Sequence, residues 1–413
     1  MNEYYIWLSQ CFAYGSDKPK MILEEYSDIE EFYNGGVAEF EKADFLTKEE
    51  IAKMTSVSLS ACQEIAGKCS RLNIDIVAYN DDLYPERLRD IFNPPSVLYV
   101  KGDIGGLDER LAFTVVGTRS MTDYSKKVTG NLSYQLAKAG AVIISGCASG
   151  LDTYAHMGAL KAGGTTIAVL ACGLDVNYPA ENRELKQQIL KHGGALISEL
   201  PPSAQTWPSI IPVRNRIMAA LGTATVVTHA PVKSGSLITA NHALEMGKDV
   251  FCVPPHDIYD EQYTGVNRLI LDGAWPALSA NDMLQVYISE YAHNITLEKP
   301  KEQDETKAET PSDSNKNPVE PTEKPPQKQP QKPPQKQTTA PKKKPGEKPP
   351  APDDLSSDER AIYDILTYDP IHINQLTEKS GLTVPSLLSA LTNLEVRGLL
   401  TAIPGKKFML YQE

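Results

Sequence analysis

Three glycine- and hydroxyl-rich segments of the chain carry residue types that can hold phosphate groups. They are residues 117–120 (Gly-Thr-Arg-Ser), 145–152 (Ser-Gly-Cys-Ala-Ser-Gly-Leu-Asp) and 233–236 (Lys-Ser-Gly-Ser). Glycine lets the backbone approach a ligand closely, and free N–H groups at a helix start attract anions. Together on one sheet edge, the three segments would form a phosphate-binding surface. For any one of them, a tight strand-to-helix turn that needs glycine for steric reasons is the alternative.

A fourth segment, residues 211–216 (Ile-Pro-Val-Arg-Asn-Arg), supplies two guanidinium groups and an amide at the expected start of a helix. With Arg119 and Lys233, these groups can converge on one crevice as fixed phosphate donors. For either arginine of the segment alone, a structural ion pair with an acid such as Glu199 is the alternative.

Several catalytic and nucleotide-binding motifs are missing from the sequence. It contains no G-x-x-x-x-G-K-[ST] loop, no G-x-S-x-G elbow and no H-E-x-x-H, and no G-x-G-x-x-G follows the first central strand. His156, one helical turn after Asp152, is expected to form a local hydrogen-bonded pair with it. His229 is expected to be structural or ligand-contacting. The sequence therefore predicts no catalytic residue, no metal site and no cofactor.

Short apolar runs must position these segments. The runs cover residues 112–117, 141–145, 166–172, 195–199, 225–228 and 249–253. Their nearly continuous hydrophobicity is typical of strands that are covered on both faces, and helical stretches separate them. We therefore expect an α/β fold with a Rossmann-like, doubly wound, mostly parallel sheet. In such sheets the ligand crevice lies beyond the carboxyl ends of the strands, where the glycine-rich segments follow.

The composition divides the chain into four predicted parts. These are an N-terminal helical, SAM-like domain (1–80), the Rossmann-like core (81–290), a disordered Pro/Lys-rich linker (291–354) and a C-terminal winged helix (355–413). Residues 300–352 hold 14 of the 30 prolines, a composition that cannot bury enough apolar surface to fold. In the winged helix, the expected recognition helix over residues 383–395 lacks Lys and Arg. This favours docking to a protein, or an evolutionary remnant, over reading of duplex DNA.

Charge and hydropathy restrict the class of protein. The net charge is -12, but residues 1–110 carry 21 acidic and 11 basic side chains whereas residues 111–290 carry 14 and 13. The acidity therefore does not exclude a nucleic-acid partner for the core. No apolar stretch approaches the ~20 residues of a membrane span. We expect a cytoplasmic protein without membrane contact, whose six cysteines are reduced core thiols.

Seven motifs occur in series over residues 116–274. They are V-G-T-R (116–119), S-G-x-A-x-G-L-D-x-x-A-H (145–156), A-L-x-x-G-G-T-T-I-A-V-L-x-x-G-L-D-x-x-Y-P (159–179), S-E-L-P (198–201), P-x-R-N-R-I (212–217), S-G-S-L-I-T-A (234–240) and G-x-N-x-L-I-x-x-G-A (265–274). This set resembles the bacterial DNA-processing protein A (DprA/Smf) family. The resemblance implies a non-enzymatic, cofactor-free binder of single-stranded DNA. Family members protect incoming strands in natural transformation, load the RecA recombinase and work as dimers through the Rossmann-like domain.

The resemblance also implies a set of DNA-binding residues. They are Gly117, Thr118, Arg119, Ser145, Gly146, Ala148, Gly150, Arg214, Asn215, Arg216, Lys233, Ser234, Gly235 and Ser236. The chain departs from the family pattern at Ser149, Ile211, Val213, His229 and Pro255. The family usually has an aromatic residue where Ile211 stands, and base stacking on an aromatic ring is worth about 1 to 3 kcal/mol per base. We therefore expect weaker binding that depends more on salt.

Two other functions remain open at this point. A phosphoribohydrolase-like, nucleotide-processing enzyme would share the Rossmann-like fold, but residues 234–241 (Ser-Gly-Ser-Leu-Ile-Thr-Ala-Asn) offer no carboxylate. A scaffold for partner proteins would use the acidic N-terminal domain and the winged helix, and it is compatible with DNA binding.

Overall fold

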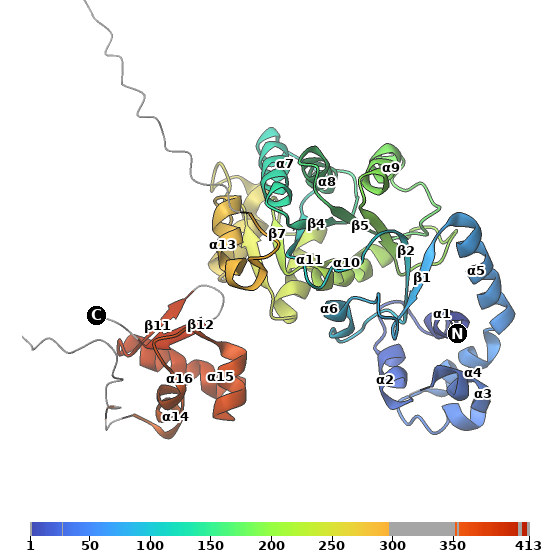
Figure 1. Ribbon diagram of the computed structural model, residues 1–413, viewed down its shortest axis with the longest axis horizontal. Coiled ribbons are helices and arrows are strands. Elements are labelled where there is room, and N and C mark those ends of the chain that lie inside the picture. Colours follow the sequence, from blue (N-terminus) through green and yellow to red (C-terminus); the bar gives the residue numbers. More distant parts are fainter. Residues whose placement is uncertain (1, 27, 297–351, 353–354, 404–406, 411–413) are drawn as a thin grey trace, which may run out of the picture. The chain divides into compact units, whose positions relative to one another are not determined.

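The computed structural model describes residues 2–26, 28–296, 352, 355–403 and 407–410 (Figure 1). The chain forms two compact units, Met1–Glu298 and Lys299–Glu413. Most of the predicted linker over 291–354 lies outside the described residues.

A nine-stranded sheet forms the centre of the first unit, in the order β1-β2-β6-β5-β4-β3-β7-β8-β9. The strands are β1 (Asp75–Ala78), β2 (Val97–Gly102), β3 (Ala112–Val116), β4 (Val142–Ser145), β5 (Thr166–Leu170), β6 (Ala195–Ser198), β7 (Ala224–Val227), β8 (Asp249–Cys252) and β9 (Trp275–Pro276). All neighbours from β6 to β9 pair in parallel, whereas β2 pairs antiparallel with β6 and with β1. The predicted Rossmann-like, mostly parallel sheet is confirmed.

Helices cover both faces of this sheet (Figure 1). They are α6 (Glu86–Arg89), α7 (Asp123–Lys138), α8 (Leu151–Lys161), η1 (Ala180–Asn182), α9 (Arg183–Lys191), α10 (Ile210–Leu221), α11 (Gly235–Glu245), η2 (Glu261–Tyr263), α12 (Thr264–Leu271) and α13 (Ala280–Tyr291). Apolar residues of α10, α11 and α12 share one buried cluster with the sheet, and those of α7, α8 and α13 share another. Alternate residues of β3, β4 and β8 enter these two clusters, and alternate residues of β2, β5 and β6 enter the first of them and a third, which explains the continuous hydrophobicity of the strands.

The chain reverses its direction across the sheet at β3. From β3 it proceeds through β4, β5 and β6, and it then crosses back to β7 on the other side of β3. The loops that follow β3 and β7 therefore diverge, and a crevice opens at this topological switch point.

The N-terminal helices pack against the same sheet. They are α1 (Asn2–Cys11), α2 (Lys18–Glu25), α3 (Ile29–Phe40), α4 (Lys48–Ser56) and α5 (Leu59–Leu72), in blue in Figure 1. Trp7 is fully buried, and its indole N–H donates to the Met54 carbonyl oxygen at 3.2 Å. One apolar cluster joins Trp7 and Phe32 to Tyr99 and Leu170 of the sheet, so helices and sheet share a continuous core.

The second unit contains three helices and a small sheet. Its elements are α14 (Ser357–Ile365), β10 (Ile371–His372), α15 (Ile373–Ser380), α16 (Val384–Val396), β11 (Leu400–Ile403) and β12 (Lys407–Leu410). The predicted hairpin is the antiparallel pair of β11 and β12, and β10 adds a third strand that the sequence pattern did not predict. Leu387, Leu391 and Leu394 are buried on one face of α16. This arrangement is a winged helix.

Two features of the described residues bear on the class of protein. The six cysteines are free and buried, as predicted. No helix in the described part of the chain is long and apolar enough to cross a membrane.

Candidate nucleic-acid interface

A hollow of about 310 Å³ lies at the switch point. The loops after β3 and β4, helix α10 and the start of α11 all contribute to its lining. Of the predicted site residues, it is lined by Gly117, Thr118, Arg119, Ala148, Arg214, Asn215, Lys233, Ser234, Gly235 and Ser236. Asp152 and Ile211, which belong to the predicted segments 145–152 and 211–216, also line it, and sequence reasoning missed its other lining residues, which are Val116, Met218, Pro231 and Thr239. The structure thus brings segments that are far apart in the sequence to one concave surface.

Backbone contacts hold the loops of the hollow together. Thr118 donates its N–H to the His229 carbonyl oxygen at 2.9 Å and accepts from the Leu151 N–H at 3.3 Å. Gly150 has a φ of +106°, and a Cβ at this position would lie 2.6 Å from the Arg119 Cα. Glycine is therefore required for the loop after β4 to pack against the loop after β3.

The start of α11 lines the hollow with Ser234, Gly235 and Ser236. Ser234 caps the helix and accepts a hydrogen bond from the Ser236 N–H at 3.4 Å. Asn215 donates from Nδ2 to the Gly235 carbonyl oxygen at 3.2 Å and so ties α10 to this helix start. The first turn of a helix carries a partial positive charge that favours anions.

Two exposed cations stand at the hollow, Arg119 after β3 and Lys233 before α11. Among the described residues, neither side chain makes a hydrogen bond or ion pair. A hydrogen bond from Ser149 lowers the pKa of the nearby Glu181, and the charge of Arg119 lowers it further. Both cations are available to an anionic ligand.

Arg214 lines the same hollow but is buried, with 6% of its surface exposed. Its Nη1 donates to the carbonyl oxygens of Gly146, at 2.9 Å, and of Val169. A Cβ at Gly146 would lie 2.7 Å from the guanidinium, so that glycine makes room for it. Arg214 is therefore a fixed positive charge that also joins two strand ends.

Asp152 is the carboxylate in the lining of the hollow. It is buried and accepts a hydrogen bond from the Ala148 N–H at 3.3 Å. Burial raises the pKa of Asp152, and the charge of Arg214 opposes this increase. Because the Arg214 guanidinium offsets the charge of Asp152, the cations of Arg119 and Lys233 make the surface of the hollow positively charged.

Four predicted site residues do not line the hollow: Ser145, Gly146, Gly150 and Arg216. Arg216 lies in a buried ion pair, with its Nη2 2.7 Å from Glu199 Oε1. This is the structural alternative that the sequence left open. Ser145 donates its hydroxyl to the Val115 carbonyl oxygen at 2.7 Å. Gly146 instead lines a small neighbouring cavity together with Arg119 and Arg214.

The two histidines singled out in the sequence are both buried. The predicted pair of His156 with Asp152 is wrong: His156 Nδ1 instead lies 2.7 Å from Thr166 Oγ1, within hydrogen-bonding distance. Burial lowers the pKa of His156 to about 3, and the charge of Arg214 lowers it further. The imidazole of His229 stacks on the Tyr263 ring with the ring centroids 4.0 Å apart.

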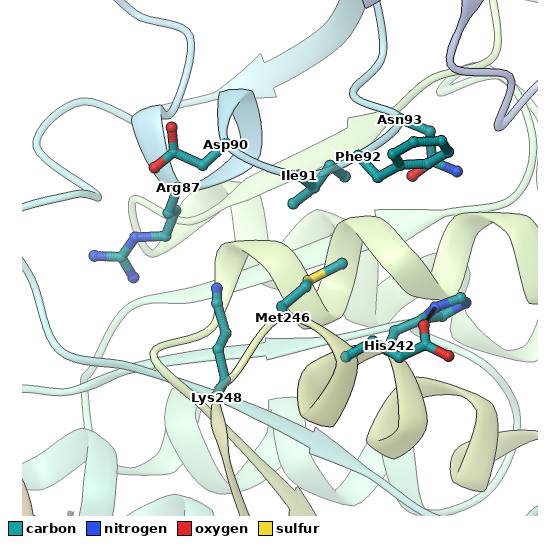
Figure 2. A pocket seen from close by; sticks show the side chains of 9 residues that line it. Arg87, Asp90, Ile91, Phe92, Asn93, His242, Met246 and Lys248 are labelled. Carbon is teal, nitrogen blue, oxygen red and sulfur yellow. Dashed lines mark hydrogen bonds and ion pairs between the residues drawn. The ribbon is translucent and has the colours of Figure 1, made fainter. Parts of the chain in front are cut away.

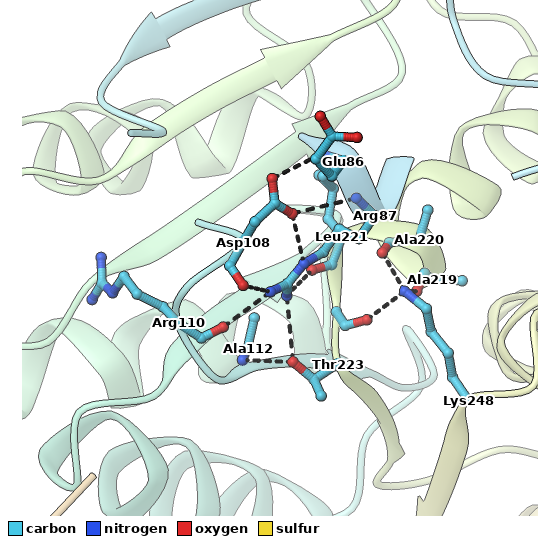
Figure 3. Close-up of polar contacts among 11 residues, drawn as sticks. Glu86, Arg87, Asp108, Arg110, Ala112, Ala219, Ala220, Leu221, Thr223 and Lys248 are labelled. Atoms are coloured by element: carbon cyan, nitrogen blue, oxygen red, sulfur yellow. Dashed lines mark hydrogen bonds and ion pairs between the residues drawn. The ribbon is translucent and has the colours of Figure 1, made fainter. Parts of the chain in front are cut away.

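The C-terminal end of α10 is anchored by two cations from distant segments (Figure 3). Lys248 Nζ donates to the carbonyl oxygens of Gly222, at 2.7 Å, and of Ala220. Arg87 donates to the Leu221 carbonyl oxygen at 2.9 Å and pairs with Asp108 at 3.0 Å. Cations at a helix C-terminus satisfy its free carbonyl groups and favour its dipole. These contacts fix the helix whose other end carries Arg214.

A second, larger hollow of about 430 Å³ lies beside this anchor. Figure 2 shows Phe92 and Asn93 on one side of it, with His242 and Met246 of the α11 segment opposite. Its cations, Arg87 and Lys248, are engaged by the α10 carbonyls and by Asp108. It therefore lacks the free cations of the switch-point hollow.

Comparisons with known proteins give the family of the chain. The family model described as DNA recombination-mediator protein A matches residues 75–288, and the model of the DprA winged helix domain matches residues 346–406. The chain is 33% identical over 344 residues to protein Smf of Synechocystis, covering 81% of this chain and 80% of that protein. It is 40% identical over 212 residues to DNA processing protein DprA of Bacillus subtilis, covering 51% of this chain and 71% of that protein.

A solved structure is similar as well. The X-ray structure of DNA processing protein A from Streptococcus pneumoniae is 30% identical and superposes with a TM-score of 0.60. The match covers 69% of this chain and 97% of that one. From its fold, its ordered motifs and these matches, the chain belongs to the DNA recombination-mediator protein A (DprA/Smf) family.

Proposed function

We propose that this protein binds the sugar-phosphate backbone of single-stranded DNA, without catalysis, and that the hollow at the switch point is the binding site. The observation that carries the proposal is the convergence of Arg119, Arg214 and Lys233 with the N-terminus of α11 on one concave surface. Cations and backbone N–H groups hold phosphates without reading base edges.

The shape of the site favours a single strand over a duplex. A flexible single strand can bend so that its phosphates enter a concave hollow. A duplex has a persistence length of about 150 base pairs, so bending it over a short site costs free energy. The carboxylate in the lining, Asp152, is buried and bound to the Ala148 N–H, which leaves the hollow without a free acid for hydrolysis. Binding is therefore favoured over nucleotide processing.

We further propose the family's cellular role for this chain: protection of incoming DNA and loading of RecA, as a homodimer in the cytoplasm. Residues 383–395, which contain no Lys or Arg, suit the winged helix to protein partners.

Fluorescence anisotropy of the full chain with single- and double-stranded oligonucleotides across a salt series tests the binding proposal. We expect tighter binding of the single strand, with log K falling against log salt at a slope of about 0.7 for each phosphate contacted. Tighter binding of the duplex, or affinity that does not change with salt, would overturn it.

The buried Arg216–Glu199 pair gives a prediction that separates structure from binding. Arg216→Met leaves the Glu199 carboxylate buried without its partner, so the free energy of unfolding should fall by about 3 to 5 kcal/mol. Affinity of the folded protein for a single strand should stay within about twofold, because Arg216 does not line the hollow.

Urea denaturation and anisotropy measure the two effects of Arg216→Met. Arg216→Met combined with Glu199→Leu is the control, since removing both charges should recover much of the lost stability. Normal stability together with lost DNA binding would contradict the structural role.

A further inference from the structure

A groove of about 620 Å³ lies outside the proposed binding site, between α7 and α8. The two helices run side by side on one face of the sheet (Figure 1). A Cβ at Gly158 would lie 2.5 Å from the Gly130 carbonyl oxygen, so the helix backbones are in close contact at this point. Long side chains of both helices line the groove on either side of this contact.

The groove combines cations with aromatic rings. Lys127 and Lys161 are exposed, and among the described residues they have no ion-pair partner. Lys126 Nζ lies 3.1 Å from Asp123 Oδ1, and this ion pair offsets the negative charge of Asp123 at this end of the groove. The remaining large side chains of the lining are the half-buried Tyr134 and Tyr154 and the exposed Met157.

This combination fits a single-stranded nucleic acid. Cations hold the phosphates of a strand, and aromatic faces stack its bases, which a duplex keeps buried. A purely acidic peptide would use the lysines but would bring no ring to stack on Tyr154 or on Tyr134, whose ring centroid lies 5.9 Å from Lys138 Nζ. The groove therefore has the side chains of a sequence-tolerant strand-binding surface.

The groove begins at the edge of the sheet that carries the switch-point hollow. Helix α7 begins at Asp123, shortly after Arg119, and α8 follows Gly150, which packs against Arg119. Each helix follows its strand, so both begin at the edge of the sheet that carries the hollow. Lys127 lies near the start of α7, whereas Lys161 is the last residue of α8, at the opposite end of the groove.

We propose that a single strand held in the hollow continues past Arg119 into the groove between α7 and α8. There Lys127 and Lys161 bind its phosphates, and Tyr134 and Tyr154 stack its bases. This inference rests on the proposed function and extends the binding site by a second surface.

Oligonucleotide length separates the groove from the hollow. We compare oligothymidylates of about 5 and about 25 nucleotides, a range that spans known single-strand site sizes. Lys127→Glu with Lys161→Glu in the full chain should weaken binding of the long strand roughly tenfold and leave binding of the short strand within about twofold. Lys48→Glu with Lys191→Glu, which reverses two exposed lysines outside the groove, is the matched control.

The outcomes distinguish the inference from the proposed function. If the groove variant binds the long strand like the control, or loses both lengths equally, the extension is overturned. If Arg119→Ala binds both lengths like the wild type, the proposed function itself fails. As a second measurement, a long strand carrying photoreactive iodouracil should crosslink to Tyr134 or Tyr154. Crosslinks confined to other residues would also overturn the extension.

Discussion

Arg214→Met is expected to lower the free energy of unfolding by about 3 to 5 kcal/mol. The substitution leaves the Asp152 carboxylate buried without its compensating charge. It also removes the donor to the carbonyl oxygens of Gly146 and Val169. Because these contacts join the ends of two strands to α10, the surface of the hollow should be lost with them. Urea denaturation followed by circular dichroism measures the change.

A second variant keeps this prediction testable if Arg214→Met does not fold. In Arg214→Met with Asp152→Asn both charges are absent, so the part of the loss that comes from the uncompensated carboxylate should return, whereas the part from the lost hydrogen bonds to Gly146 and Val169 should remain. Affinity for a single strand should remain reduced, since the fixed cation of the hollow is gone. If Arg214→Met were as stable as the wild type, the guanidinium would not have the structural role assigned to it.

Arg119→Ala with Lys233→Ala should reduce affinity for a single strand by about a hundredfold at low salt. Charge-assisted hydrogen bonds contribute about 1.5 to 3 kcal/mol each, and exposure places these two toward the lower end. Both side chains are exposed and make no hydrogen bond or ion pair among the described residues, so the fold should not change. Anisotropy with a labelled oligothymidylate gives the affinity.

The control for this variant is Lys48→Ala with Lys191→Ala, which removes the same charge at exposed positions outside the hollow. Equal loss in the two variants would mean that net charge, and no particular site, determines binding. Loss restricted to the Arg119 and Lys233 variant would locate the strand at the switch point.

The sequence predicted the sheet well because parallel strands that are covered on both faces leave a continuous apolar pattern. All six runs became strands of the described sheet. The rule that ligands bind beyond the carboxyl ends of such strands then correctly placed Arg119, Arg214 and Lys233 around one hollow. Their role in DNA binding stays a prediction.

Other features depend on how the elements pack against one another, which residue spacing alone does not give. Arg214 and Arg216 are separated by about 200° around α10, so one reaches the hollow and the other pairs with Glu199. The antiparallel strand β2 is as buried as the parallel ones, but its pairing with β6 brings together segments about a hundred residues apart. The anchoring of α10 by Lys248 depends on contacts with backbone carbonyls, which leave no pattern in the sequence.

The proposed function requires that the switch-point hollow binds phosphates. Its most direct test is the salt dependence of single-strand binding, measured for the wild type beside Arg119→Ala with Lys233→Ala. Each phosphate contact on a single strand contributes about 0.7 to the slope of log K against log salt. If these two cations each hold a phosphate, the slope should become smaller in magnitude by about 1.4. An unchanged slope, with both proteins folded, would show that the strand binds elsewhere.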